Sequence, residues 1–191
     1  MMETSQIILI AFILSLVLYN YSGLYVSRKY DAKIPFWSTI LKGHDLTFYL
    51  IYGSYLALVI GAALAIITER FQLPLTIAGF GVILVSIVIT LLARQELARN
   101  WSPLAGTSAE QILIKSGIYA HIRHPIYTSG ILLSLGLALV TGSLWGLALF
   151  ILAVIAFVVR INAEEKALLA KFGVEYQEYA QNTGALLPKL H

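Results

Sequence analysis

The sequence contains no cysteine among its 191 residues, and charged residues are scarce. The missing cysteines exclude a disulfide framework and a cysteine-ligated metal site. Charged residues make up 12% of the chain and apolar residues 59%, whereas a soluble domain usually carries about 25% charged residues. This balance argues against a water-soluble globule, and the high apolar content excludes a disordered chain.

The few charged residues leave long apolar runs between them. No charge lies between Glu3 and Arg28, and two further charge-free runs cover residues 46–68 and 71–93. Each run exceeds 20 residues, so as a helix it can cross a hydrocarbon core of roughly 30 Å. We therefore predict three membrane-spanning helices. The first lacks the basic start of a signal peptide.

A fourth charge-free run covers residues 125–159 and is too long for one ordinary span. Thr141-Gly142-Ser143 in its middle is a turn signal that divides it into 125–140 and 144–159. The chain is thus predicted to be an all-α integral membrane protein with about five transmembrane helices, the last two forming a hairpin. A four-span chain with a re-entrant hairpin is the alternative. A hairpin this short should hold Arg123-His124 and residues 160–165 at one membrane face.

Basic residues predict the orientation of the chain. All 13 Lys and Arg residues except Arg70 fall in segments that a five-span topology places on one side. The positive-inside rule then puts the N-terminus outside and the C-terminus in the cytoplasm. The net charge of +3 is therefore no sign of a nucleic-acid partner. We expect residues 1–93 to form three helices and residues 94–191 to form a catalytic region: an interfacial loop, the hairpin 125–160 and cytosolic C-terminal helices.

Polar side chains gather where the chain enters the predicted hairpin: Tyr119, His121, Arg123, His124 and Tyr127. Such a group is typical of an interfacial anchor. It is also suited to binding, because Pro125 favours the first helical turn and a helix N-terminus attracts a carboxylate, such as that of an amino-acid-like cofactor.

A second polar group follows the hairpin. Arg160 and Glu164 are four residues apart and share a helix face. They are either an ordinary helix-end ion pair or, as ionisable groups near membrane depth, part of a functional site. The aromatic residues of 172–179 are either simple packing or the cover of a pocket.

Together these residues form an ordered pattern: Gly117-x-Tyr119, Arg123-His124-Pro125-x-Tyr127, Glu164-Glu165 and Phe172-Gly173-x-x-Tyr176-x-x-Tyr179. Residues 94–190 thereby resemble the isoprenylcysteine carboxyl methyltransferase family, in a wider group that includes phospholipid amine N-methyltransferases. The resemblance implies methyl transfer from S-adenosyl-L-methionine, with S-adenosyl-L-homocysteine as product, to a lipophilic acceptor from the bilayer. The carboxylate of a prenylcysteine is the acceptor we expect, and no metal is implied.

The resemblance also implies roles for individual residues. Arg160 matches a position associated with the acceptor, whose carboxylate it could orient. Glu165, or His121, is a candidate base if the acceptor is an amine. The residues implied in cofactor binding are Gln111, Ile112, Leu113, Ile114, Tyr119, His124, Pro125, Ile126, Tyr127 and Glu164.

Two departures and three alternatives accompany this interpretation. Gln111 stands where animal enzymes tend to have histidine, and Asn182 where they carry an arginine, a difference that concerns the substrate. A phospholipid amine N-methyltransferase is one alternative. An NADPH-dependent membrane sterol or enone reductase is another; those enzymes carry a similar Arg-His-Pro-Asn-Tyr element, but this chain has Ile126 before the tyrosine. A transporter or scaffold is the third, disfavoured because the first three helices lack charges.

Overall fold

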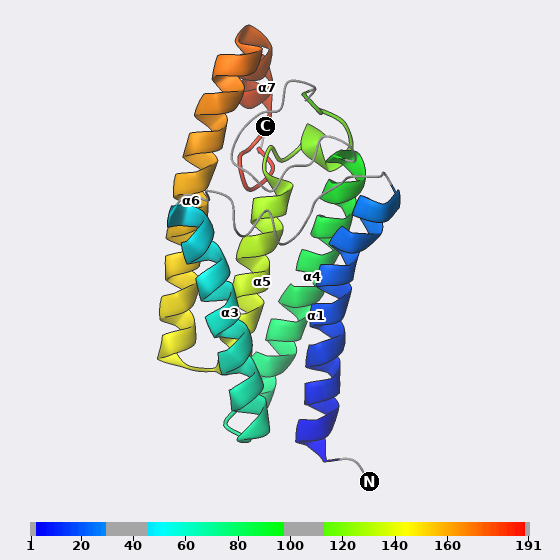
Figure 1. Cartoon of the computed structure of the whole chain (residues 1–191), viewed down its shortest axis with the longest axis vertical. Helices are drawn as coiled ribbons and strands as arrows, with labels where there is room; N and C mark the ends of the chain where they lie inside the picture. Colours follow the sequence, from blue (N-terminus) through cyan, green and yellow to red (C-terminus); the bar gives the residue numbers. More distant parts are fainter. Residues whose placement is uncertain (1–2, 30–45, 98–112, 190–191) are drawn as a thin grey trace.

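The computed structural model describes residues 3–29, 46–97 and 113–189, and every regular element in these ranges is a helix (Figure 1). The all-helical prediction is therefore confirmed for this part of the chain. The elements are α1 (Thr4–Lys29), α3 (Leu46–Ile67), α4 (Leu73–Leu97), the short 3-10 helix η2 (Gly117–Ala120), α5 (Pro125–Thr141), α6 (Leu144–Phe172) and α7 (Val174–Asn182).

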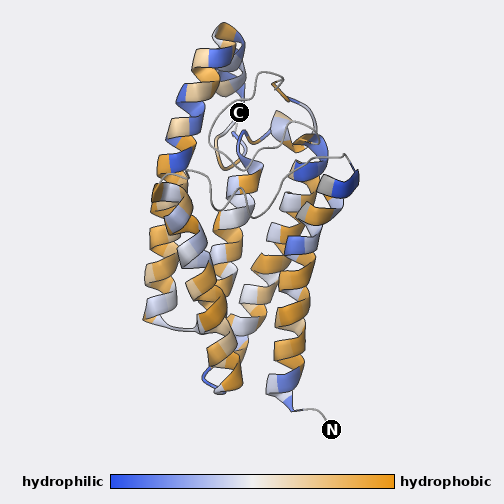
Figure 2. Cartoon of the chain, viewed as in Figure 1, coloured by the Kyte–Doolittle hydropathy of each residue, from blue (hydrophilic) through white to orange (hydrophobic). Residues whose placement is uncertain are grey.

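The charge-free runs of the sequence became the long helices. In the described ranges α1, α3, α4 and α6 are each long and apolar enough to cross a membrane. Figure 2 shows their hydrophobic residues along most of the bundle, with many hydrophilic residues at the upper end and a few at the lower end. At about 1.5 Å per residue, the 17 residues of α5 span about 26 Å. That α5 forms a fifth span stays a prediction.

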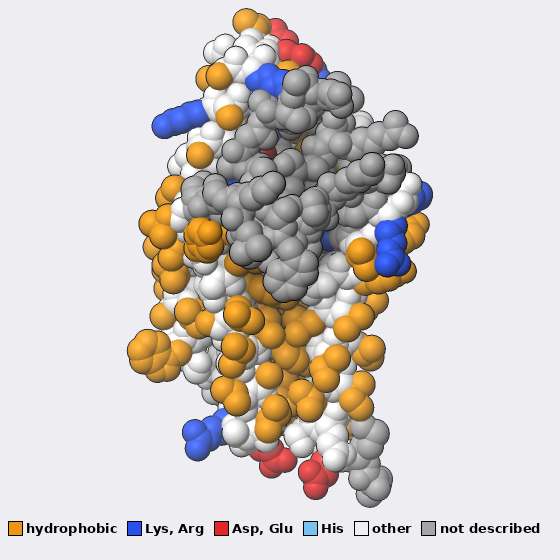
Figure 3. Space-filling view, viewed as in Figure 1, with side chains coloured by type: hydrophobic (Ala, Val, Ile, Leu, Met, Phe, Trp, Pro, Cys, Tyr) orange, Lys and Arg blue, Asp and Glu red, His pale blue; other side chains and the backbone are white. Residues whose placement is uncertain are grey.

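The outer surface of the bundle is apolar. Large aliphatic side chains are more than half exposed on all four long helices, among them Leu14, Ile60, Leu84 and Ile155. Figure 3 shows hydrophobic side chains spread over the lower half of the face in view. A soluble monomer rarely exposes contiguous apolar surface of this extent. These helices therefore present their outer faces to lipid.

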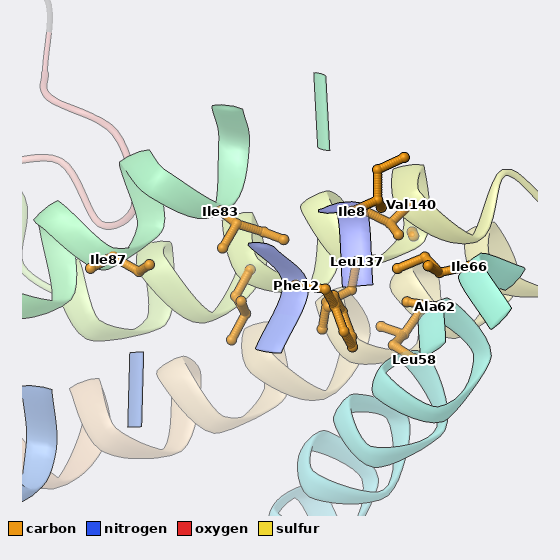
Figure 4. Close-up of a cluster of buried hydrophobic side chains, with 11 residues drawn as sticks. Ile8, Phe12, Leu58, Ala62, Ile66, Ile83, Ile87, Leu137 and Val140 are labelled. Atoms are coloured by element: carbon orange, nitrogen blue, oxygen red, sulfur yellow. The ribbon is translucent and has the colours of Figure 1, made fainter. Parts of the chain in front are cut away.

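The centre of the bundle is α5, which packs against α3, α4 and α6. It crosses α4 where two glycines meet. A Cβ atom on Gly136 would lie 2.8 Å from the carbonyl oxygen of Gly79, and one on Gly79 would lie 2.7 Å from the carbonyl oxygen of Gly136. Only glycine allows the two backbones to approach this closely. Beside this crossing, Leu58, Ile83 and Leu137 are fully buried in the main apolar core (Figure 4).

Hydroxyl groups join α4 to α5 inside the bundle. Ser86 donates to the carbonyl of Ser129 at 2.9 Å, and the hydroxyls of Thr90 and Ser129 share a short hydrogen bond. All three residues are buried. Because polar groups away from water must be paired, this network fixes how far α4 and α5 can slide.

Helices α5 and α6 are joined by Gly142 and Ser143, within the predicted turn. Gly142 adopts φ 56°, the left-handed conformation that glycine favours, and the Ser143 hydroxyl accepts from the Gly146 N–H at 3.1 Å. The first segment ends close to the predicted turn, and α6 continues without a break to Phe172, as the shared helix face of Arg160 and Glu164 requires. Residues 160–165 therefore belong to the same helix as the apolar segment before them.

Charged residues of the described ranges gather at two opposite ends. Arg28 and Lys29 end α1, Arg94 lies in the last turn of α4, and α6 and α7 carry further charges at the same end of the bundle (Figure 1). Arg70 lies at the opposite end, between α3 and α4. The predicted orientation of the termini and the division at residue 93 stay predictions.

Candidate active site

The predicted site lies at the polar end, where a C-terminal segment returns to the start of α5. We call residues Thr183–Leu186 the C-terminal strap. Its carbonyls accept from two backbone N–H groups just before α5: Arg123 donates to Gly184 at 2.9 Å and His124 to Ala185 at 3.0 Å. The hydroxyl of Thr128 reaches further along the strap, to the carbonyl of Leu186 at 2.8 Å.

Arg123 links three elements through one guanidinium. Its Nε and Nη2 donate to Oε1 of Glu165 on α6 at 3.0 and 2.8 Å. Its Nη1 donates to the carbonyls of Ala180, at 3.0 Å, and Thr183 at the end of α7. A cation beside helix C-terminal carbonyls is also favoured by the helix dipole. The two polar groups predicted to meet at one membrane face are thus in direct contact here.

His124 shares the same carboxylate. Its Nε2 lies 3.1 Å from Glu165 Oε1, and its side chain is 3% exposed. The imidazole stacks on the ring of Tyr127, with centroids 5.7 Å apart and planes 18° apart. A ring fixed at one nitrogen and on one face has a defined orientation.

Arg160 lies deeper, near the apolar part of the bundle. It is 4% exposed, and its Nε donates to the Tyr127 hydroxyl at 3.3 Å. One turn further along α6, Oε2 of Glu164 is buried without a hydrogen-bond partner in the described part of the chain. A buried carboxylate oxygen without a donor is costly, so this oxygen is suited to receive a donor from a ligand.

Helix α7 is joined to η2 by a tyrosine hydrogen bond. The Tyr179 hydroxyl donates to the carbonyl of Tyr119 at 2.6 Å. Burial raises the pKa of Tyr179 to about 12 and raises the pKa of Tyr119 and Tyr176 as well. All three phenols are therefore neutral at physiological pH. The aromatic residues of 172–179 pack together, as one of the two interpretations of the sequence required.

The remaining predicted site residues differ in how deeply they are buried. Leu113 packs against the buried side chains of Tyr176 and Tyr179. Pro125 is buried as the first residue of α5, and Ile114 and Ile126 are partly buried. His121, a candidate base, is exposed. Gln111 and Ile112 lie outside the described residues, as does most of the expected interfacial loop.

Asn182 takes no part in this centre. It is exposed, and its amide donates to the Glu178 carbonyl at 2.9 Å. It lines an open hollow of about 310 Å³ beside α7. Lys115 and Glu175, also in this hollow, form an ion pair at 2.8 Å.

The sequence predicts Arg123 as part of an interfacial anchor and of the Arg-His-Pro-x-Tyr element, without a binding or catalytic role of its own, and it does not predict the strap. The strap carries no motif, because backbone hydrogen bonds to residues 61 to 63 positions earlier hold it in place. Such long-range pairing is not visible in local composition.

The described residues fit a cofactor with an amino-acid moiety. In the described part of the chain, the N–H groups of Ile126 and Tyr127 find no backbone acceptor at the start of α5, and a helix N-terminus with free N–H groups binds carboxylates. The buried Oε2 of Glu164 offers an acceptor to an ammonium or hydroxyl group. No group of three or more potential metal ligands occurs in the described ranges.

Comparisons with known proteins agree with this chemistry. The phospholipid methyltransferase family matches residues 74–175. The protein-S-isoprenylcysteine O-methyltransferase of Saccharomyces cerevisiae is 28% identical over 93% of this chain and 78% of that enzyme. The enzyme of the same name from Schizosaccharomyces pombe is 32% identical over 41% of this chain and 34% of its own length.

A third relative has a different name. The cobalt-zinc-cadmium resistance protein CzcN of Cupriavidus metallidurans is 37% identical over 41% of this chain and 36% of its own length. The protein has an apolar helical bundle with a polar site at one end, and the two relatives described first are methyltransferases by name. Together these features identify it as a membrane methyltransferase. Because the family match covers more than half of the sequence, the chain belongs to the phospholipid methyltransferase family.

Proposed function

We propose that the chain transfers a methyl group from S-adenosyl-L-methionine to the carboxylate of a prenylcysteine or a similar lipophilic acceptor. The position of one residue, Arg160, supports a carboxylate as the acceptor. Arg160 is a buried cation at the inner end of the apolar part of α6, in contact with Tyr127, whose ring stacks on His124. A lipid-borne anion could therefore meet a guanidinium beside the residues proposed to hold the cofactor.

The bound cofactor would supply a methyl group on a sulfonium, and the protein would supply alignment. The N–H groups at the start of α5 would hold the cofactor's carboxylate, and Glu164 its ammonium or ribose hydroxyls. Tyr119, His124, Pro125 and residues 111–114 would complete the pocket.

Arg160 would orient the acceptor's carboxylate through its planar fork of donors. That carboxylate is already ionised at neutral pH, so no general base is required. Water exclusion and alignment supply the remaining catalysis.

An amine acceptor would require a base, and the candidates are poorly suited to that role. Oε1 of Glu165 is engaged by Arg123 and His124, and His121 is exposed. This arrangement favours O-methylation over phospholipid amine N-methylation. The family match likewise favours a methyltransferase over the reductase and transporter alternatives.

The test is a methyl-transfer assay with the full chain in lipid vesicles. Labelled S-adenosyl-L-methionine is offered with a prenylcysteine, its carboxamide analogue and a phosphatidylethanolamine. We expect base-labile label in the prenylcysteine and none in its carboxamide. Label in the phospholipid headgroup alone would overturn the choice of acceptor. Calorimetric binding of NADPH but not of S-adenosyl-L-homocysteine would overturn the assignment to methyl transfer.

A further inference from the structure

We propose that Arg123 and Glu165 form a positioning pair that clamps the C-terminal strap onto the start of α5 and fixes the imidazole of His124 toward the cofactor. The proposal deepens the proposed function and rests on it, because His124 is assigned to the cofactor there. The proposal gives a role to Arg123 and to the strap. It also assigns Glu165 to orienting His124 instead of to accepting a proton from the substrate.

The clamp follows from the partners of the guanidinium. Arg123 contacts Glu165 on α6 with two nitrogens and the end of α7 with the third. Its side chain is 11% exposed. Lysine could not replace this arrangement, because its single ammonium lacks the rigid fork that reaches two carbonyls and a carboxylate together.

The strap depends on the same contacts. Thr183, whose carbonyl accepts from Arg123, directly precedes the residues that pair with the chain before α5. A parallel β-bridge joins Ile122 to Gly184. Three backbone hydrogen bonds surround this bridge. The guanidinium strengthens this attachment, because hydrogen bonds to charged groups are stronger than neutral ones.

The imidazole is oriented through the other partner of the pair. A Glu165 carboxylate only accepts hydrogen bonds, so the Nε2 of His124 carries the proton between them. With Nε2 engaged by Glu165, Nδ1 is the ring nitrogen that would face a polar group of the cofactor. Stacking on Tyr127 restricts rotation of the ring.

The experiment compares Arg123→Gln, Arg123→Lys, Glu165→Gln and the double glutamine variant in the full chain in detergent. Lys115→Gln is the matched control, since it removes an exposed ion pair to α7 outside the clamp. Hydrogen exchange of the strap and of residues 121–124 is measured without ligand. Affinity for S-adenosyl-L-homocysteine is measured by calorimetry.

We expect exchange at the Arg123, His124 and Gly184 amides to rise about tenfold in both Arg123 variants, while α3 and α4 stay unchanged. Dissociation constants for S-adenosyl-L-homocysteine should rise about tenfold for each glutamine variant, consistent with losing one charge-assisted contact. The double variant should lose little more than either single one, since partners in one network are not additive. Lys115→Gln should match the wild type.

Three results would overturn the proposal. Unchanged strap exchange in Arg123→Gln would remove the clamp. Faster exchange with unchanged cofactor affinity would reduce the pair to a structural role. Fully additive losses in the double variant would show that the two residues act separately. If the wild type binds no S-adenosyl-L-homocysteine, the proposed function fails and the cofactor half of this proposal fails with it, whereas the exchange data still decide the clamp.

Discussion

The apolar bundle and the polar end of this molecule are held together by different forces. In the bundle, α4 and α5 approach through Gly79 and Gly136, and large aliphatic side chains fill the core. At the polar end, one arginine joins three elements through charge-assisted hydrogen bonds to a carboxylate and two carbonyls. Close packing with a few neutral hydroxyl hydrogen bonds fixes the bundle, whereas charge-assisted hydrogen bonds fix the site.

The difference separates the region that stabilises the fold from the region proposed to bind ligands. Lipid around the bundle offers no hydrophobic driving force between helices, so close packing and interhelical hydrogen bonds must stabilise it. The polar end must instead admit a soluble ligand, and three backbone hydrogen bonds pair its strap with residues 121–124. We therefore expect substitutions in the bundle to change stability, and substitutions in the site to change binding or turnover.

The largest expected effect is on turnover at Arg160. Arg160→Ala removes the proposed partner of the acceptor's carboxylate and should lower kcat/KM by at least about 100-fold, the scale of losing an oriented charged contact in the transition state. Arg160→Lys keeps the charge without the planar fork and should recover part of the loss. An Arg160→Ala enzyme with wild-type turnover would remove Arg160 from the mechanism.

The next effect is on cofactor affinity. Glu164→Gln replaces the carboxylate whose Oε2 is buried without a partner in the described part of the chain. It should raise the KM for S-adenosyl-L-methionine about tenfold, because hydrogen bonds to charged groups contribute more than neutral ones. Its effect on the KM for the acceptor should be small. A change confined to the acceptor's KM would contradict the assignment of Glu164.

In the bundle, alanine substitutions at Gly136 and Gly53 can be compared directly. Gly136→Ala places a Cβ 2.8 Å from a backbone carbonyl and 2.6 Å from Ile83, so α4 and α5 must separate. It should lower the free energy of unfolding by about 1–3 kcal/mol. Gly53→Ala has nothing within 4 Å and should be neutral or slightly stabilising. Thermal unfolding in detergent measures both, and equal effects would refute the close crossing.

The smallest effect concerns Tyr179. Tyr179→Phe deletes the hydrogen bond to Tyr119 and should cost about 1 kcal/mol of stability. Because burial raises the pKa of Tyr179 to about 12, the unfolded chain releases this proton first, near pH 10. The wild type should therefore lose stability between pH 10 and 12, and the variant should lose less. Identical pH profiles from pH 9 to 12 would contradict the burial of this phenol.

The fold was largely predictable because charge-free runs and a turn signal are local features. The runs 46–68 and 71–93 correspond to α3 and α4, and Thr141-Gly142-Ser143 marks where α5 ends and α6 begins. Composition did not reveal how buried α5 is. Its hydroxyl and glycine residues contact α4, and such contacts depend on which helices become neighbours.

The site was predictable only in part. Tyr119, His124 and Glu164 stand out as polar groups beside apolar runs. The partners that orient them come from a strap without a motif and from the second carboxylate of a Glu-Glu pair. Which of Glu164 and Glu165 faces Arg123 depends on the rotation of α6 relative to α5, which the spacing of residues does not determine.

The proposed site has an acceptor side at Arg160 and a cofactor side at Glu164. Calorimetric titration of Arg160→Ala and Glu164→Gln with S-adenosyl-L-homocysteine separates the two sides. We expect near wild-type affinity for Arg160→Ala and affinity about tenfold weaker for Glu164→Gln. Lost binding in Arg160→Ala together with unchanged binding in Glu164→Gln would contradict this assignment.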